Sequence, residues 1–138
     1  MQSVNQPVRL PLLTQKQVTL VLKREDLLHP FISGNKYRKL KYNLLEAQRQ
    51  GHETLLTFGG AFSNHILATA FAASERGLKS IGVIRGDELE HTWQDNPTLA
   101  KAHTYGMVFK FVSREIYRAK AEVSFLTLLQ KQFGRFYV

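Results

Sequence analysis

A repeated order of helix, glycine and strand constrains the fold of this chain more than any other feature. Each of four glycines follows a stretch of helical pattern and precedes, by a few residues, a short apolar run typical of strands. These glycines are Gly51, Gly77, Gly106 and Gly134. The helical stretches between them are long enough for right-handed crossovers. The pattern therefore predicts an α/β fold in three layers, with helices flanking a parallel sheet.

The apolar runs and the capping residues locate the predicted elements. The predicted strands are 53–58, 80–85, 107–112 and a stub at 135–138. Asn96 precedes Pro97, which places a typical N-cap residue before a proline at the first helical position. Ser113 precedes the amphipathic stretch 114–133, which we predict to be one long helix.

The first 50 residues carry fewer signals. Alternating apolar residues predict a strand at 18–22. A helix is predicted after Asn35, because its apolar residues recur at spacings of three, four and three and share one face. These residues are Tyr37, Leu40, Leu44 and Ala47. We therefore expect residues 1–50 to form an arm of one strand and one helix, and residues 51–138 to form a unit of four parallel strands and three helices.

Charge provides only a weak indication of function. The chain has 19 Lys and Arg against 11 Asp and Glu, which gives a net charge of +8. Its one dense basic cluster, 36–41, lacks the spacing of a nucleic-acid-binding motif. A solvated helix face is the simpler explanation of this cluster, so we expect no nucleic-acid partner.

Composition excludes several other classes of protein. With 138 residues the chain is long enough for one domain with its own core. It has no cysteine, which removes disulfides, thiolate metal ligands and thiol nucleophiles, and no metal site is predicted. No apolar run approaches the roughly 18 residues that cross a bilayer, and the first residues do not resemble a signal peptide. We therefore expect a cytoplasmic protein without membrane contact.

The segment 58–65 has the features of an anion-binding turn. It combines the end of a predicted strand, a pair of glycines and the start of a helix, whose free N–H groups carry partial positive charge. Open parallel sheets bind ligands at this edge. Neither a dinucleotide-binding motif nor a phosphate loop is present. A structural interpretation is equally supported, in which Ser63 caps the helix, Asn64 bonds to backbone and His65 packs or faces solvent.

The segment 33–39 is the second candidate for chemistry. Gly34 and Asn35 tolerate tight backbone geometry, and Lys36 follows in the first turn of its helix, where a positive charge opposes the macrodipole. A lysine placed there beside other cations is a candidate to form a Schiff base. For the segment taken alone, a lysine that points into solvent is the favoured interpretation.

Three runs in order carry a resemblance to a known family: Leu-Lys-Arg-Glu-Asp at 22–26, Ser-Gly-Asn-Lys at 33–36 and Gly-Gly-Ala-Phe-Ser-Asn-His at 59–65. In order and spacing they resemble the 1-aminocyclopropane-1-carboxylate (ACC) deaminase and D-cysteine desulfhydrase family. These are pyridoxal 5′-phosphate (PLP) enzymes of fold type II, similar to the tryptophan synthase β subunit. The resemblance continues through 81–86, 96–99 and 111–115. It implies the N-terminal part of an incomplete fold-type-II enzyme.

The resemblance implies a role for five residues. Lys36 resembles the lysine that binds the cofactor covalently, and Lys39 resembles a cation near the cofactor phosphate. Asn64 resembles the partner of the ring hydroxyl. Ser63 resembles the serine that lies beside the substrate carboxylate or attacks the substrate. His65 stands where the deaminases carry glutamine and the desulfhydrase-like members carry histidine, which favours sulfur elimination slightly. Ser63, Asn64 and His65 are therefore the residues implied to contact substrate.

The implied activity is that of a PLP-dependent deaminase or lyase, which acts on a small amino acid and releases ammonia and a 2-oxo acid. Family members are longer, and their remaining cofactor contacts lie beyond the last residue of this chain. We therefore expect a truncated chain that is inactive alone, with 1–50 as the arm of the larger PLP-binding domain and 51–138 as the smaller domain. A full-length chain is expected to form homo-oligomers. Four leucines are expected to form an exposed apolar patch: Leu20, Leu22, Leu40 and Leu44.

Two other functions stay open on the sequence. The chain could be a non-catalytic remnant that keeps the motif but binds PLP weakly. It could also be a basic α/β module that binds a polyanion through the cluster 36–41. The net charge does not discriminate between these functions.

Overall fold

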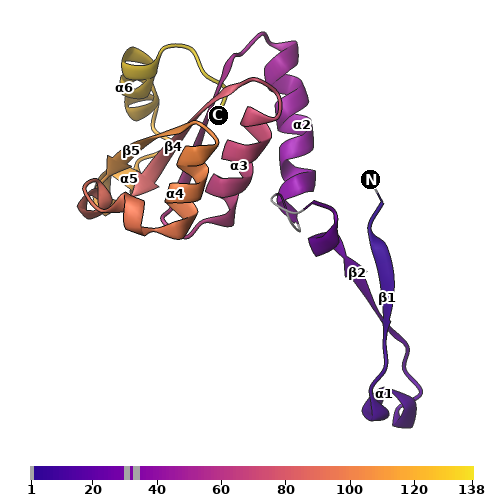
Figure 1. The fold of residues 1–138 in the computed structure, drawn as a ribbon. Coiled ribbons are helices and arrows are strands. Elements are labelled where there is room, and N and C mark those ends of the chain that lie inside the picture. The colour runs from indigo at the N-terminus through magenta and orange to yellow at the C-terminus, as the bar shows by residue number, and fades with distance from the viewer. Residues whose placement is uncertain (1, 30–31, 33–34) are drawn as a thin grey trace.

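A computed structural model describes residues 2–29, 32 and 35–138 (Figure 1). Its helices and strands follow the chain in the order β1 Val4–Val8, α1 Pro11–Gln15, β2 Leu20–Arg24, α2 Asn35–Arg49, β3 Thr54–Gly60, α3 Asn64–Ser74, β4 Lys79–Arg85, α4 Pro97–Thr104, β5 Met107–Val112, α5 Arg114–Arg118 and α6 Val123–Phe133. Short 3₁₀ turns lie at Glu25–Leu27, Asp87–Leu89 and Trp93–Asp95. In these described ranges, no helix has the length and apolar character needed to cross a membrane.

Three of the predicted strands form a parallel sheet in the order β3-β4-β5. The fourth predicted strand contributes only one bridge, between Tyr137 and Leu55. Two backbone hydrogen bonds hold this bridge, from Leu56 N to Tyr137 O at 2.7 Å and from Tyr137 N to Thr54 O at 2.9 Å. Of the described segment after Gly134, therefore, only Tyr137 pairs with the sheet, so the expected four-stranded sheet has three full strands.

Helices cover both faces of the sheet, which confirms the predicted three-layer α/β fold (Figure 1). Side chains alternate between the faces along each strand. On β4, Ile84 packs with Ile66 of α3 and Leu99 of α4. The preceding residue, Val83, packs on the opposite face with Leu129 of α6. All five of these side chains are buried.

The predicted long helix at 114–133 is wrong, because the structure has two helices there. α5 ends at Arg118 and α6 begins at Val123. The residue before α6 has extended backbone, and its N–H donates to the carbonyl of Ala119 at 2.9 Å. This break lets Tyr117 and Phe125 contact one ring, that of Phe58, at centroid distances of 6.2 and 6.5 Å.

The first part of the chain forms a hairpin that projects from the α/β body (Figure 1). β1 pairs antiparallel with β2, and α1 lies in the connection between them. The sequence did not predict β1 or α1, and the strand expected at 18–22 lies two residues later. In the hairpin, Leu20 and Leu22 are exposed as predicted.

The burial of α2 corrects the second half of the predicted apolar patch. Leu40 and Leu44 are buried, because α2 packs its apolar face against Ala68 and Ala72 of α3. Ala47 belongs to the same buried cluster. The predicted apolar face of this helix is therefore present, but it is covered by the chain itself. The side chain of Tyr37, also predicted on this face, lies outside the described residues.

Candidate active site

The turn between β3 and α3 is built by close packing. A Cβ added at Gly59 would collide with the side chain of Ile66 and lie 3.2 Å from the Cβ of Ser63. At Gly60 the nearest atom to an added Cβ would be in the guanidinium of Arg85, at 3.8 Å. Gly59 therefore lets the turn fold tightly onto the first turn of α3, whereas the space beside Gly60 is open.

The Ser63 hydroxyl does not cap α3. Ser63 occupies the N-cap position with extended backbone, but its side chain makes no capping hydrogen bond. Two other helix starts differ in this respect. The Asn96 side chain accepts hydrogen bonds from Thr98 N and Leu99 N, both at 3.0 Å, and Ser113 Oγ accepts from the N–H of residue 116 at 3.2 Å. The structural interpretation of Ser63 as a simple cap therefore lacks its hydrogen bond.

Asn64 and His65 form the first residues of α3. The side chain of Asn64 is exposed. His65 is half-buried, and its Nε2 lies 2.8 Å from Oγ1 of Thr57, a buried residue of β3. Burial lowers the pKa of the His65 imidazole, and the nearby charges of Lys36 and Lys39 lower it further. His65 is therefore a neutral ring near neutral pH.

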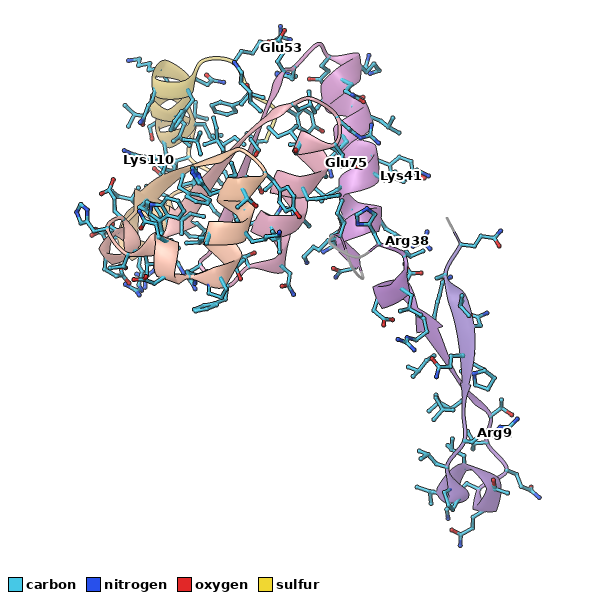
Figure 2. The ribbon with its side chains drawn as sticks, viewed as in Figure 1. Arg9, Arg38, Lys41, Glu53, Glu75 and Lys110 are labelled. Atoms are coloured by element: carbon cyan, nitrogen blue, oxygen red, sulfur yellow. The ribbon has the colours of Figure 1, made fainter. Side chains whose placement is uncertain are left out.

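Lys36 lies in the first turn of α2, and its Nζ donates a hydrogen bond to Asn35 Oδ1 at 3.1 Å. Among the described residues, no carboxylate pairs with Lys36. Arg38, which lies two residues later and is labelled in Figure 2, makes two hydrogen bonds to Glu25 at 2.8 and 2.9 Å. The Lys39 side chain is exposed. Among the described residues, Lys36 thus has no ion-pair partner, whereas Arg38 of the same helix pairs with Glu25.

The starts of α2 and α3 lie on the same side of the molecule. Leu40 and His65 line one cavity of about 120 Å³ between α2, β3 and α3. Lys36 lies four residues before Leu40, and therefore on the same face of α2, one turn nearer the helix start. The charge of Lys36 acts on the imidazole of His65, which agrees with this placement. The structure thus brings Lys36 and Lys39 near the Ser63–His65 turn. Ser33 and Gly34, which the sequence placed in the same segment, lie outside the described residues.

This set of groups suits an anionic ligand that carries an aldehyde. An aldehyde requires an amine that no carboxylate holds, which is the situation of Lys36. A phosphate requires a nearby cation, which Lys39 can supply, and N–H groups at the start of a helix, which α3 has. A ring hydroxyl requires a polar partner such as the exposed amide of Asn64. These residues therefore fit PLP in charge and chemistry.

Sequence reasoning missed Thr57. It is a polar residue within an otherwise apolar strand run, Thr-Leu-Leu-Thr-Phe at 54–58, and it lies eight residues before His65. That polar interruption was a usable signal. Without the turn geometry, however, the sequence could not show that the hydroxyl reaches the imidazole.

Comparison with known proteins adds independent support. No protein-family model matches the chain. A curated protein named a putative ACC deaminase, from Pyrococcus abyssi, is 42% identical over 72 residues, which are 52% of this chain and 22% of that protein. A D-cysteine desulfhydrase of Yersinia pestis is 38% identical over 65 residues, which are 47% of this chain and 20% of that protein. Over about half of its length, the chain is thus similar to curated proteins named as ACC deaminases and D-cysteine desulfhydrases.

Solved structures extend this relationship to the fold. The crystal structure of an ACC deaminase homologue superimposes with a TM-score of 0.72 and 28% identity, over 100% of this chain and 41% of that one. An O-ureido-L-serine synthase superimposes with a TM-score of 0.64 at 16% identity, over 97% of this chain and 40% of that one, which shows a shared fold. The resemblance seen in the sequence and the predicted fold class are thus confirmed. The matched residues of the chain span about a fifth of the length of these curated proteins.

Proposed function

We propose that this chain forms the lysine-bearing part of a PLP-dependent deaminase or lyase that acts on a small amino acid, as an ACC deaminase or a D-cysteine desulfhydrase does. The observation that carries the proposal is that α2, which bears Lys36 and Lys39, and the start of α3 line one cavity, through Leu40 and His65. The charges of Lys36 and Lys39 act on His65, which directly follows Ser63 and Asn64. One bound cofactor could therefore contact both helix starts.

In this proposal each residue has a stated task. The amine of Lys36 binds the cofactor aldehyde, Lys39 lies near the phosphate, and Asn64 bonds to the ring hydroxyl. PLP, when bound, supplies an electron-accepting ring conjugated to the Cα of the amino acid. The Lys36 amine would hold or return a proton at that Cα.

The substrate would lie against the start of α3. The Ser63 hydroxyl makes no capping bond, so it is available to the substrate carboxylate. The neutral imidazole of His65 adds no positive charge to a site that already contains two lysines. A histidine at this position favours sulfur elimination over deamination slightly.

We further propose that residues 1–50 belong to the larger, PLP-binding domain and that residues 51–138 form the smaller domain. In a full-length protein the chain would form a cytoplasmic homo-oligomer, with no nucleic-acid or membrane partner. The 138 residues alone are expected to turn over no substrate. The chain matches 41% of the length of the ACC deaminase homologue.

Reduction of the PLP adduct tests the proposal. The chain is incubated with PLP, reduced with borohydride, digested and analysed by peptide mass spectrometry. We expect preferential labelling of Lys36, abolished by Lys36→Ala. Lys41→Ala is the matched control, because Lys41 lies on the same helix and its side chain points away from the sheet (Figure 2).

Two results would contradict the proposal. Equal labelling of many exposed lysines, unaffected by Lys36→Ala, would indicate a non-catalytic remnant. Nucleic-acid binding with a steep salt dependence, lost when Lys39 and Lys41 are neutralised together, would favour a polyanion-binding module instead.

A further inference from the structure

The hydrogen bond between Thr57 and His65 joins β3 to the first turn of α3 beneath the candidate site. Thr57 is 9% exposed, and its Oγ1 lies 2.8 Å from Nε2 of the half-buried ring. Both residues line the cavity of about 120 Å³, which Leu40 and Leu44 of α2 also line. The imidazole is therefore hydrogen-bonded to a buried hydroxyl of β3. The charges of Lys36 and Lys39 lie near enough to lower the pKa of the ring.

The position of the hydroxyl proton follows from the surroundings of Thr57. Among the described residues, His65 Nε2 is the only hydrogen-bond partner of Thr57 Oγ1. A buried O–H without an acceptor is costly, and a neutral imidazole offers one acceptor nitrogen. The Thr57 hydroxyl is therefore satisfied when it donates to Nε2. In that arrangement the ring proton lies on Nδ1, because a neutral imidazole carries only one.

We propose that Thr57 is a positioning residue that holds His65 in the tautomer protonated at Nδ1, so that the ring serves as a neutral N–H donor to an anionic group of the ligand. The inference rests on the proposed function for the identity of that ligand. Lys36, Lys39 and the Nδ1–H group are all donors, which suits the phosphate of PLP or the carboxylate of an amino acid. A neutral ring can donate there without adding a third charge to the two lysines.

The tautomer can be measured directly by nitrogen NMR of the histidine rings in the chain without ligand. In the wild-type chain, we expect the protonated-type shift at Nδ1 of His65 and the acceptor-type shift at Nε2. Thr57→Val should move the ring to a mixture of tautomers or to the form protonated at Nε2. Thr57→Ser keeps the hydroxyl and should keep the wild-type tautomer, which separates the loss of the bond from a failure to fold.

Thr69→Val is the matched control. Thr69 is also buried, at 3% exposed, and lines the same cavity, but its Oγ1 has no hydrogen-bond partner among the described residues. The same substitution should therefore leave the His65 tautomer unchanged. A wild-type ring protonated at Nε2, or an unchanged tautomer in Thr57→Val, would overturn the inference.

Labelling with PLP and borohydride provides the functional measurement. Loss of one hydrogen bond to an anion should reduce labelling of Lys36 in Thr57→Val by about 2- to 10-fold at limiting PLP, while Thr69→Val remains at the wild-type level. Equal labelling of Lys36 in the two variants would contradict a donor role of His65 toward the PLP phosphate. If Lys36 is not labelled even in the wild-type chain, the proposed function fails, whereas the NMR result still decides whether Thr57 sets the tautomer.

Discussion

The hairpin and the α/β body both contain apolar side chains, but they bury them to different extents. In the hairpin, β1, α1 and β2 contain no buried residue, and Val4, Leu12 and Leu22 are 51–61% exposed. In the body, five of the seven residues of β4 are buried. The strands of both regions carry branched apolar side chains. The difference is that helices cover both faces of β4, whereas no layer of the described chain covers the hairpin. Burial is thus a property of the layers, and apolar sequence alone does not produce it.

The largest expected effect is on the stability of the body. Leu99→Ala removes a fully buried side chain between α4 and the sheet. It should lower the free energy of unfolding by about 2–5 kcal/mol. Leu22→Ala, in the hairpin, should change it by about 0.5 kcal/mol or less, because Leu22 is 51% exposed. Urea denaturation of the two variants measures both values, and similar losses would show that the hairpin has a core of its own.

A smaller effect is expected at the turn of the candidate site. Gly59→Ala introduces a methyl group that collides with Ile66, so the free energy of unfolding should fall by about 1–3 kcal/mol. Gly60→Ala is the neighbouring control, since its added methyl group would meet only Arg85 at 3.8 Å. It should change stability by about 0.5 kcal/mol or less. Equal losses in the two variants would show that this turn is not tightly packed on α3.

The smallest expected effect concerns the ion pair that connects the hairpin to α2. The Arg38 guanidinium of α2 lowers the pKa of Glu25, just after β2, from 4.5 to about 2. Because the pKa is lower in the folded chain, this pair stabilises the fold above a pH of about 4.5, and that contribution is lost as the pH falls toward about 2. The pair is exposed to solvent, so its contribution to stability is small.

Titration of the Glu25 carboxyl carbon by NMR measures this coupling. Arg38→Gln should raise the pKa of Glu25 toward 4.5. Arg49→Gln is the matched control, because Arg49 lies on the same helix but pairs with Glu46, at 2.6 Å. An unchanged Glu25 titration in Arg38→Gln would mean that the hairpin is not joined to α2 through this pair.

Local signals predicted the body better than the hairpin. The strands after Gly51, Gly77 and Gly106 lie within two residues of their predicted bounds, and Asn96 caps its helix through its side chain. In contrast, β1 has no partner close to it in sequence, since it pairs with a strand that begins 12 residues after it ends. Such a pairing depends on how the intervening chain turns, which the apolar pattern does not encode.

The candidate site was also only partly predictable. Lys36 and the Ser63–His65 turn could be identified as candidate site residues from their spacing and from the family resemblance. The break after α5 and the covering of Leu40 and Leu44 could not, because both depend on contacts with residues far along the chain. Phe58 draws Tyr117 and Phe125 to one ring, and α3 provides the apolar surface that buries α2.

The sequence by itself determined the alternation of strands and helices, because glycine, caps and apolar periodicity act within a few residues. It also determined which groups can bind an aldehyde or an anion, since these are properties of the side chains. Only the tertiary structure decided that Lys36 of α2 lies beside the start of α3 and that Thr57 reaches His65. The first depends on α2 packing against α3, the second depends on α3 packing over β3, and both packings are determined by the shape of the whole core.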